Sequence, residues 1–469
     1  MILKPFTHDP RGCASYLLGD VAQAKALVVD PLLEIGVEPY VLEAAAKGLQ
    51  ITAIVETHMH ADHLSAARAL QEVTGATLYV YEGASLAIPF TPVRDGDAIE
   101  VGAVRLRVLF TPGHTLDSVC LVGEDATRAR APWFALTGDT LFSGDVGRPD
   151  LVLGEVDPGQ VRAQAAMLYD SIFGRLLTLD DATEIYPGHF GGSPCGGVHL
   201  SGKPFSTVGF ERRFNLALQQ RSREAFIEFV TGTLRPQPER YRNIKEQNLK
   251  GVAMPGAEPN GEGPRLAPAE AQAAIAAGAV PLDVRPTVLF GRGHVPGALN
   301  VPFTLANLAR AVEVVLPAGE PVVVIADNDV VARASVRALA GAYRVKGYLA
   351  RGMAAWTAAG LPAGQFEMMS VDDLRRRLQR HEPLQVVDVR DPYEWEAGHI
   401  QEAALVPMRD LREHLPGLKG ADGPLVVLCA SGTRASTAAS FFRREGAGRV
   451  YCLQGGMEEW TREGYPTAR

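Results

Sequence analysis

The chain has 469 residues, of which 46% are hydrophobic and 21% are charged, so its composition is that of a folded protein rather than a disordered one. At roughly 100–200 residues per domain, this length predicts about three domains. The formal net charge of −8 argues against a nucleic-acid-binding surface, because phosphate contacts need clustered Lys and Arg. No apolar run approaches the roughly 18 residues needed to cross a bilayer, so we expect neither nucleic acid nor membrane as a partner.

The five cysteines do not form a disulfide framework, because their number is odd and they are spread from Cys13 to Cys452. The first residues, Met-Ile-Leu-Lys-Pro-Phe-Thr-His, lack the long apolar core of a secretory signal. Both features predict a cytoplasmic protein with reduced thiols.

The first 250 residues alternate predicted strands and helices. Short β-branched runs predict strands at 51–55 and 104–109, and helical spacing of apolar residues predicts helices at 66–73, 162–168 and 212–230. Such alternation is typical of the α/β class.

The C-terminal half contains an internal repeat. Asp283-Val284-Arg285 recurs as Asp388-Val389-Arg390, and Gly293-His294 recurs as Gly398-His399 at the same offset. The apolar run 321–325 recurs at 424–428. We therefore expect two copies of one α/β domain, residues 265–363 and 367–469, after a Gly/Pro/Glu-rich linker at 251–264.

Imidazole and carboxylate groups follow several predicted strands of the first domain, residues 1–250. His58, His60, Asp62 and His63 come just after the strand at 51–55. Three more such side chains follow later predicted strands: His114 in Thr-Pro-Gly-His, Asp139 in Thr-Gly-Asp and His189 in Tyr-Pro-Gly-His. Side chains at strand ends can converge at one edge of a sheet, and this donor set suits zinc, iron, copper or nickel. The sequence therefore predicts a metal site.

The motif His-X-His-X-Asp-His, followed by His114, Asp139 and His189, resembles the metallo-β-lactamase fold over residues 1 to about 250. This resemblance implies an αββα sandwich with the metal site at its edge. The reaction is not specified by the fold.

Residue types alone leave two metal arrangements open. In the first, two zinc ions are bridged by Asp139; one is held by His58, His60 and His114, and the other by Asp62, His63 and His189. That arrangement would give a hydrolase of the glyoxalase II kind, in which a metal-bound hydroxide attacks a thioester, joined to a sulfurtransferase tail.

The local sequences 57–63, 111–115, 138–142 and 147–150 instead resemble the persulfide dioxygenase branch. This resemblance implies one Fe(II) per chain, bound by His58, His114 and Asp139. Two imidazoles and one carboxylate leave three adjacent coordination positions open, and iron, unlike zinc, can change its oxidation state. The remaining residues would orient ligands and water around the iron, namely His60, Asp62, His63 and His189.

Two further residues near this motif set have candidate roles. Arg148, in Gly-Arg-Pro-Asp, matches a family position near the carboxylate of the thiol substrate. Cys195 follows His189 in the glycine-rich segment 191–197 and is a candidate relay for a sulfane sulfur. Cys13 and Cys120 lie in strand-like runs, where we expect core packing.

The two repeat copies differ at one cysteine. Cys429 directly follows the strand 425–428 and precedes small residues and a helix, so backbone N–H groups and the helix N-terminus favour its thiolate. Arg434 adds a positive charge for anion stabilisation. This loop resembles that of a rhodanese domain, in which Cys429 is the persulfide-forming nucleophile. In the first copy Ala326 and Val331 occupy these two positions, so residues 265–363 are expected to keep the fold without sulfur transfer.

The whole chain resembles the persulfide dioxygenase–rhodanese fusions with two rhodanese repeats. This resemblance implies a sulfide-detoxifying enzyme that oxidises a low-molecular-weight thiol persulfide with O2 to sulfite. At Cys429 a sulfane sulfur would be passed to sulfite, giving thiosulfate. Dioxygenases of this kind are often dimers or tetramers, so we also expect a homo-oligomer.

Overall fold

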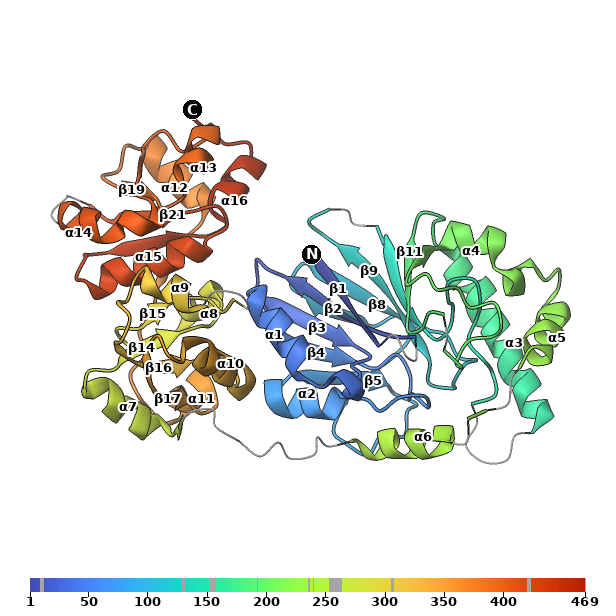
Figure 1. Ribbon diagram of the computed structural model, residues 1–469. Coiled ribbons are helices and arrows are strands. Elements are labelled where there is room, and N and C mark those ends of the chain that lie inside the picture. Colours follow the sequence, from blue (N-terminus) through green and yellow to red (C-terminus); the bar gives the residue numbers. More distant parts are fainter. Residues whose placement is uncertain are drawn as a thin grey trace. The chain divides into compact units, whose positions relative to one another are not determined.

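The computed structural model describes residues 1–8, 12–128, 131–151, 157–191, 193–234, 237–238, 240–252, 264–304, 308–419 and 423–468 (Figure 1). The chain folds into two compact units, residues 1–40 with 51–257 and residues 41–50 with 258–469. The expected linker at 251–264 lies outside the described residues, apart from positions 251, 252 and 264. Within the described segments, no helix has the length and apolar character needed to span a bilayer.

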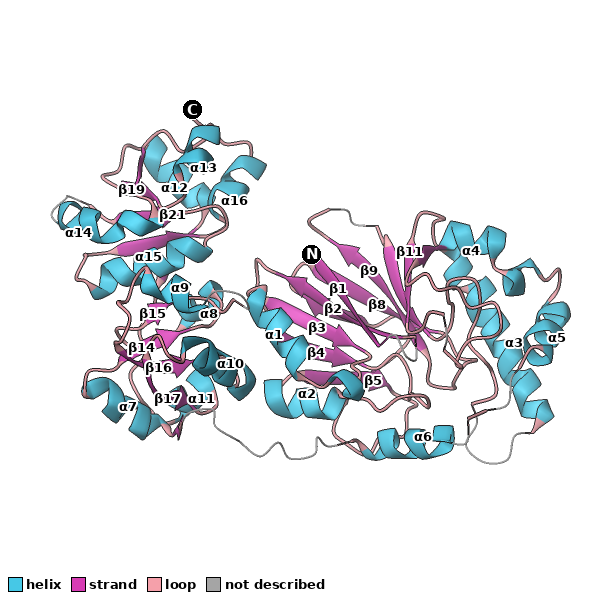
Figure 2. Ribbon diagram, viewed as in Figure 1, coloured by secondary structure: helices cyan, strands magenta, loops and turns pink. Residues whose placement is uncertain are grey.

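The first unit is built on two six-stranded sheets, whose strand orders are β1-β2-β3-β4-β5-β6 and β12-β11-β10-β9-β8-β7 (Figure 2). The strands of the first sheet are β1 (Ile2–His8), β2 (Cys13–Asp20), β3 (Lys25–Val29), β4 (Gln50–Val55), β5 (Thr77–Tyr81) and β6 (Thr91–Val93). Those of the second are β7 (Ala98–Val101), β8 (Val104–Phe110), β9 (Val119–Asp125), β10 (Phe134–Gly138), β11 (Glu184–Pro187) and β12 (Ser206–Thr207). The helices along residues 1–252 are α1 (Glu38–Ala46), α2 (Ala67–Thr74), α3 (Pro158–Gly174), α4 (Val208–Phe214), α5 (Arg223–Gly232) and α6 (Arg240–Lys250).

The inner faces of the two sheets pack against each other to form the main core. Along β8, the side chains of Val104, Leu106 and Val108 are buried while the arginines between them are exposed, as expected for a strand with one face in a core. The opposite face of the second sheet is covered by α3 and α5, through residues such as Leu168 and Phe226. This arrangement confirms the α/β class and the αββα sandwich.

The prediction of one continuous helix at 212–230 is wrong, because the chain forms three separate elements there: α4, a short 3-10 helix (Leu216–Gln219) and α5. Local side chains explain the breaks. Asn215 accepts a hydrogen bond from the N–H of Ala217, and Ser222 accepts one from the N–H of Ala225. Each side chain therefore caps a new helix, which the apolar spacing did not reveal.

The second unit contains two five-stranded parallel sheets with the same topology, β13-β17-β16-β14-β15 and β18-β22-β21-β19-β20. The first copy has β13 (Arg265–Leu266), α7 (Pro268–Ala276), β14 (Val280–Asp283), α8 (Thr287–Arg292), β15 (Leu299–Asn300), α9 (Leu308–Glu313), β16 (Pro321–Ile325), α10 (Asp329–Leu339), β17 (Arg344–Leu349) and α11 (Gly352–Ala358). The second has β18 (Glu367–Met369), α12 (Val371–Gln379), β19 (Gln385–Asp388), α13 (Pro392–Ala397), β20 (Ala403–Leu405), α14 (Leu411–Lys419), β21 (Leu425–Leu428), α15 (Thr433–Arg444), β22 (Val450–Leu453) and α16 (Gly456–Arg462). The identical strand orders confirm that the sequence repeat is a repeat of one fold.

The repeated Asp-Val-Arg and Gly-His motifs form a buried ion pair in each copy. Arg285 lies 2.7 Å from Asp283 and donates a hydrogen bond of 2.7 Å to the carbonyl of Gly293. The second copy repeats both contacts, at 2.7 and 2.8 Å, with Arg390, Asp388 and Gly398. Buried charges are tolerated only when they are paired and hydrogen-bonded, so these motifs recur because the fold needs them.

A buried hydrogen-bond network joins the two copies through Asn300 on β15. Its backbone N–H donates to the hydroxyl of Ser440 on α15 at 3.0 Å, and its side-chain oxygen accepts from Ser436 at 2.5 Å. Its amide nitrogen donates to the carbonyls of Asp283 and Arg285, each at 3.0 Å. One side chain of the cysteine-free copy therefore contacts the helix that follows Cys429.

Replacing Asn300 by Ala should destabilise the second unit, since the Ser436 hydroxyl and two backbone carbonyls lose their partners while buried. We expect the free energy of unfolding to fall by roughly 1–3 kcal/mol. Denaturant unfolding followed by circular dichroism measures this change. Gln401→Ala, which removes an exposed amide of the same unit, is the matched control. Equal stability of the two variants would contradict the network.

Candidate functional site

Three of the predicted metal ligands converge at the strand ends of the sandwich. His58 follows β4, His114 follows β8 and Asp139 follows β10. The Nε2 atoms of His114 and His58 lie 3.3 and 3.8 Å from Oδ2 of Asp139. All three side chains are buried, and one ligand atom from each lies within 4.8 Å of the others. The structure therefore brings together the two imidazoles and one carboxylate expected for a single metal.

The hydrogen bonds of the two imidazoles leave the lone pair of each Nε2 available. Nδ1 of His114 donates to the carbonyl of Arg148 at 2.9 Å, and Nδ1 of His58 donates to the Thr57 hydroxyl at 3.0 Å. Thr57 donates in turn to Asp30 at 2.7 Å. With the proton on Nδ1, Nε2 is the atom that can bind a cation.

The free Nε2 atoms fit a bound metal. Among the described residues, neither Nε2 of His58 nor Nε2 of His114 has a hydrogen-bond partner, although both are buried. Burial lowers the pKa of both imidazoles, which keeps them neutral. A buried polar atom without a partner is costly, and a cation would remove this cost for both nitrogens at once. Burial raises the pKa of Asp139, but the neighbouring imidazoles, His189 first, hold it below its usual value and keep the carboxylate charged.

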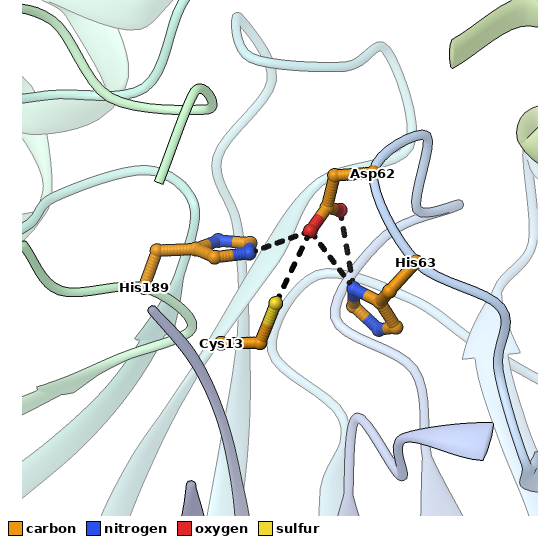
Figure 3. A group of neighbouring side chains, drawn as sticks. All are labelled: Cys13, Asp62, His63 and His189. Atoms are coloured by element: carbon orange, nitrogen blue, oxygen red, sulfur yellow. Dashed lines mark hydrogen bonds and ion pairs between the residues drawn. The ribbon is translucent and has the colours of Figure 1, made fainter. Parts of the chain in front are cut away.

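Cys13, Asp62, His63 and His189 form a second cluster (Figure 3). Its members are directed at the Asp62 carboxylate, from which His189 Nε2 lies 2.8 Å away, His63 Nδ1 3.1 Å and the Cys13 sulfur 3.5 Å. The other nitrogen of His189 lies 2.8 Å from Asp139. Both nitrogens of His189 are therefore hydrogen-bonded, and His189 orients the carboxylate of the first cluster. Nε2 of His63 is buried and has no hydrogen-bond partner among the described residues.

The ring of His60 lies 4.1 Å from that of His58, but its Nε2 atom faces two carboxylates. Its Nε2 lies 3.0 Å from Glu56 and 3.2 Å from Asp30, and all three side chains are buried. Burial opposes protonation, but the two carboxylates raise the pKa of His60 well above its usual value. In this structure His60 therefore does not join His58 and His114 in a three-imidazole site.

The side chain of Arg148 is buried and paired with another residue of its own loop. Its guanidinium makes a two-pronged contact with Asp150, at 2.7 and 2.8 Å, and donates to the carbonyl of Pro194 at 3.0 Å. The side chain is only 4% exposed. Its backbone carbonyl, which holds Nδ1 of His114, is the part of Arg148 that acts on the metal site.

Cys195 is near the metal cluster but is buried. Its sulfur lies 3.5 Å from the hydroxyl of Tyr241, and it shares an apolar cluster with Phe142 and Leu151. Its sulfur also lies within 4.8 Å of ligand atoms of Asp139 and His189. Burial raises the pKa of this thiol well above its usual value, so the nucleophilic thiolate that a sulfur relay needs is disfavoured.

Sequence reasoning missed three residues of the site: Cys13, Asp30 and Thr57. Asp30 follows β3 directly, so the strand-end rule that located the other ligands could have found it. Thr57 adjoins the histidine motif but has no pattern of its own. Cys13 begins β2 and is buried as expected, and its sulfur also contacts Asp62, which the core prediction did not reveal.

Cys429 lies at the end of β21, with backbone N–H groups directed at its sulfur. The N–H groups of Gly432 and Ala435 lie 3.1 and 3.4 Å from Sγ. Arg434 makes a two-pronged contact with Glu394 on α13, at 2.7 and 2.8 Å, which raises the pKa of the guanidinium. The loop is therefore shaped to stabilise an anionic sulfur, and the positive charge beside it is fixed by a carboxylate.

In the corresponding loop of the first copy, a side chain rather than a cysteine sulfur accepts hydrogen bonds at the N-terminus of the helix. The Asn328 side chain accepts hydrogen bonds from the N–H groups of Val330 and Val331, each at 3.1 Å. Ala326 stands at the position of Cys429, and burial raises the pKa of Asp327 to about 6. An asparagine therefore caps the start of α10 in the copy that lacks the cysteine.

Comparisons with known proteins agree with this division of the chain. The model of the metallo-beta-lactamase superfamily matches residues 8–189, and that of the rhodanese-like domain matches 267–359 and 370–463. An uncharacterized protein of Mycobacterium leprae is 32% identical over 246 residues, which cover 47% of this chain and 99% of that protein. The mitochondrial persulfide dioxygenase ETHE1 of Homo sapiens is 30% identical over 258 residues, covering 55% of this chain and 91% of that one. The solved structure of a metallo-beta-lactamase from Staphylococcus aureus has a TM-score of 0.50 at 27% identity and covers 75% and 99% of the two chains.

Gly188→Ala tests the geometry of the metal cluster. A Cβ atom at position 188 would lie 2.7 Å from Oδ1 of Asp139, so the carboxylate would have to move. We expect metal affinity to fall roughly 10–100-fold, as for other changes that displace a ligand. Metal content after dialysis against graded ferrous iron measures the effect. Gly174→Ala, where nothing lies within 4 Å of the added carbon, is the control, and equal metal content in the two variants would contradict the assignment.

Proposed function

This chain belongs to the ETHE1-like family of the metallo-β-lactamase superfamily and carries two rhodanese-like domains, and on that premise we propose that it is an iron-dependent persulfide dioxygenase coupled to a sulfurtransferase. The first unit would oxidise a low-molecular-weight thiol persulfide with O2 to sulfite. The second unit would transfer sulfane sulfur to sulfite and release thiosulfate.

The observation that carries the proposal is the contrast between the two clusters. His58 and His114 each direct a buried Nε2 atom without a hydrogen-bond partner among the described residues toward Asp139. In the second cluster Nδ1 of His63 and both nitrogens of His189 are already hydrogen-bonded to Asp62 or Asp139, and only Nε2 of His63 lacks such a partner among the described residues. One metal position is therefore favoured over two. The dinuclear zinc hydrolase would also need Nε2 of His60 to face the same ion as Nε2 of His58. The two rings lie 4.1 Å apart, but Nε2 of His60 is paired with Glu56 and Asp30.

The residues around the first cluster would hold and orient a ferrous ion rather than take part in bond making. A ferrous ion bound there would supply the change of oxidation state that lets a persulfide react with dioxygen, which zinc does not supply. Thr57 and the carbonyl of Arg148 fix the two imidazoles, and His189 fixes the Asp139 carboxylate. Burial of all these groups excludes bulk water from the ligands.

At the second site, the Cys429 thiolate would attack the outer sulfur of a persulfide. A new S–S bond forms at Cys429, the S–S bond of the donor breaks, and the carrier leaves as a thiol. Sulfite then attacks the outer sulfur and departs as thiosulfate, which restores the thiolate. The two N–H groups at Sγ would stabilise the anion in each step, and fusion of both activities in one chain would raise the local sulfite concentration.

Removal of the metal ligand His114 should abolish the first reaction. We expect His114→Ala to lose both bound iron and oxygen uptake with glutathione persulfide, while His199→Ala, an exposed histidine of the same unit, keeps both. Oxygen uptake by chelator-treated wild type should return with ferrous iron and not with zinc. Uptake that persists without iron, or that zinc restores, would contradict the dioxygenase proposal.

Removal of the Cys429 thiol should separate the two activities. Cys429→Ser is expected to form sulfite at the wild-type rate and to accumulate it, because no sulfane sulfur is loaded. Chromatography of the reaction products measures the amounts of sulfite and thiosulfate formed by each variant. Cys452→Ser, a buried cysteine of the same domain, should still form thiosulfate. Unchanged thiosulfate in Cys429→Ser would exclude this cysteine as the nucleophile.

A further inference from the structure

A cavity of about 540 Å³ opens beside the loop that carries the metal ligands. Met59, which lies between His58 and His60 in the sequence, forms part of its wall. Other parts come from α3 and α6, through residues such as Met167 and Lys245. The cavity therefore borders the loop that carries the metal ligands, although none of the three ligands of the candidate iron site lines it, and its lining residues all belong to the first unit.

The wall of this cavity is mainly apolar and open to solvent. Leu116 and Met167, both in the wall, are 62% and 40% exposed and can therefore contact a bound molecule. Small-molecule sites combine such apolar walls with a few polar groups that fix the orientation of the ligand.

Among the described residues of the wall, Lys245 is the only cationic side chain. Its ammonium donates a hydrogen bond to the carbonyl of Leu151 at 3.0 Å, which places it on the wall. Asp117, the acidic residue of the wall, accepts a hydrogen bond from the N–H of Met59 at 2.9 Å. Burial lowers the pKa of Lys245, and the nearby Asp117 carboxylate opposes this shift. An anion bound in the cavity would add a second favourable interaction with the ammonium group.

The arginine expected to bind the substrate's carboxylate is not in this wall. Arg148 points into the protein, where Asp150 and the carbonyl of Pro194 occupy its guanidinium. Lys245 is therefore the basic group available at the cavity next to the metal ligands.

We propose that this cavity binds the carrier portion of the thiol persulfide and that Lys245 pairs with an anionic group of the carrier, a carboxylate or a phosphate. The identity of the ligand as a persulfide carrier rests on the proposed function, whereas the binding of an acidic thiol derivative does not. Lys245 is then a specificity-determining residue that selects acidic over neutral carriers.

Binding of unreactive thioethers tests the proposal without turnover. S-methylglutathione supplies carboxylates and S-methyl-coenzyme A supplies phosphates, and titration calorimetry on the full chain gives both dissociation constants. For the preferred probe, Lys245→Gln should weaken binding roughly tenfold, as expected for loss of a charged hydrogen bond. Lys245→Arg should retain most of the affinity. Lys250→Gln, an exposed lysine at the end of the same helix, should change it by less than about twofold.

The results distinguish a carboxylate from a phosphate as the bound anion. They also distinguish failure of the cavity assignment from failure of the proposed dioxygenase function. If Lys245→Gln weakens the binding of S-methylglutathione, and if the dimethyl ester of this probe binds weakly to the wild type, the anion is a carboxylate. If Lys245→Gln weakens only the binding of S-methyl-coenzyme A, the anion is a phosphate. Both results support the cavity assignment, even if no persulfide is oxidised, in which case only the proposed function fails. Equal binding by wild type and Lys245→Gln, or no binding of either probe to the wild type, would overturn the cavity assignment.

Discussion

Burial of two imidazole nitrogens and a carboxylate at one point is the constraint on which the first unit depends. Nε2 of His58 and Nε2 of His114 lie beside Asp139 with no hydrogen-bond partner among the described residues, an arrangement that is costly unless a cation binds there. The surrounding groups fix this geometry. Thr57 and Asp30 hold one imidazole, the carbonyl of Arg148 holds the other, and His189 holds the carboxylate. The sandwich places these groups together because the strand ends lie at one edge.

The second unit shows how one fold can keep or lose a reactive thiol without changing its architecture. Both copies share the strand order and the buried Asp–Arg pair. In the second copy, N–H groups at the start of α15 face the sulfur of Cys429; in the first, those at the start of α10 are capped by Asn328. The cysteine-free copy still contributes, since Asn300 is hydrogen-bonded to Ser436 and Ser440 on α15.

Patterns that depend on strand ends and repeats were predictable from the sequence, whereas side-chain direction was not. The α/β class and the two repeated domains follow from periodicity and motif spacing, and the sandwich follows from the resemblance of the histidine motif to the metallo-β-lactamase fold. The same spacing cannot show that His60 faces Glu56 rather than the metal ligands, because adjacent positions in a loop have no fixed direction. It also cannot show that Arg148 is paired with Asp150, or that α6, far along the chain, brings Lys245 to a cavity next to Met59.

The central claim, a single redox-active metal held by His58, His114 and Asp139, is tested most directly by anomalous diffraction from crystals of protein purified without added metal. Data collected on both sides of the iron absorption edge distinguish iron from zinc and locate each ion. The account predicts one iron peak among these three side chains and no peak at Asp62, His63 and His189. Two zinc peaks bridged by Asp139 would contradict it.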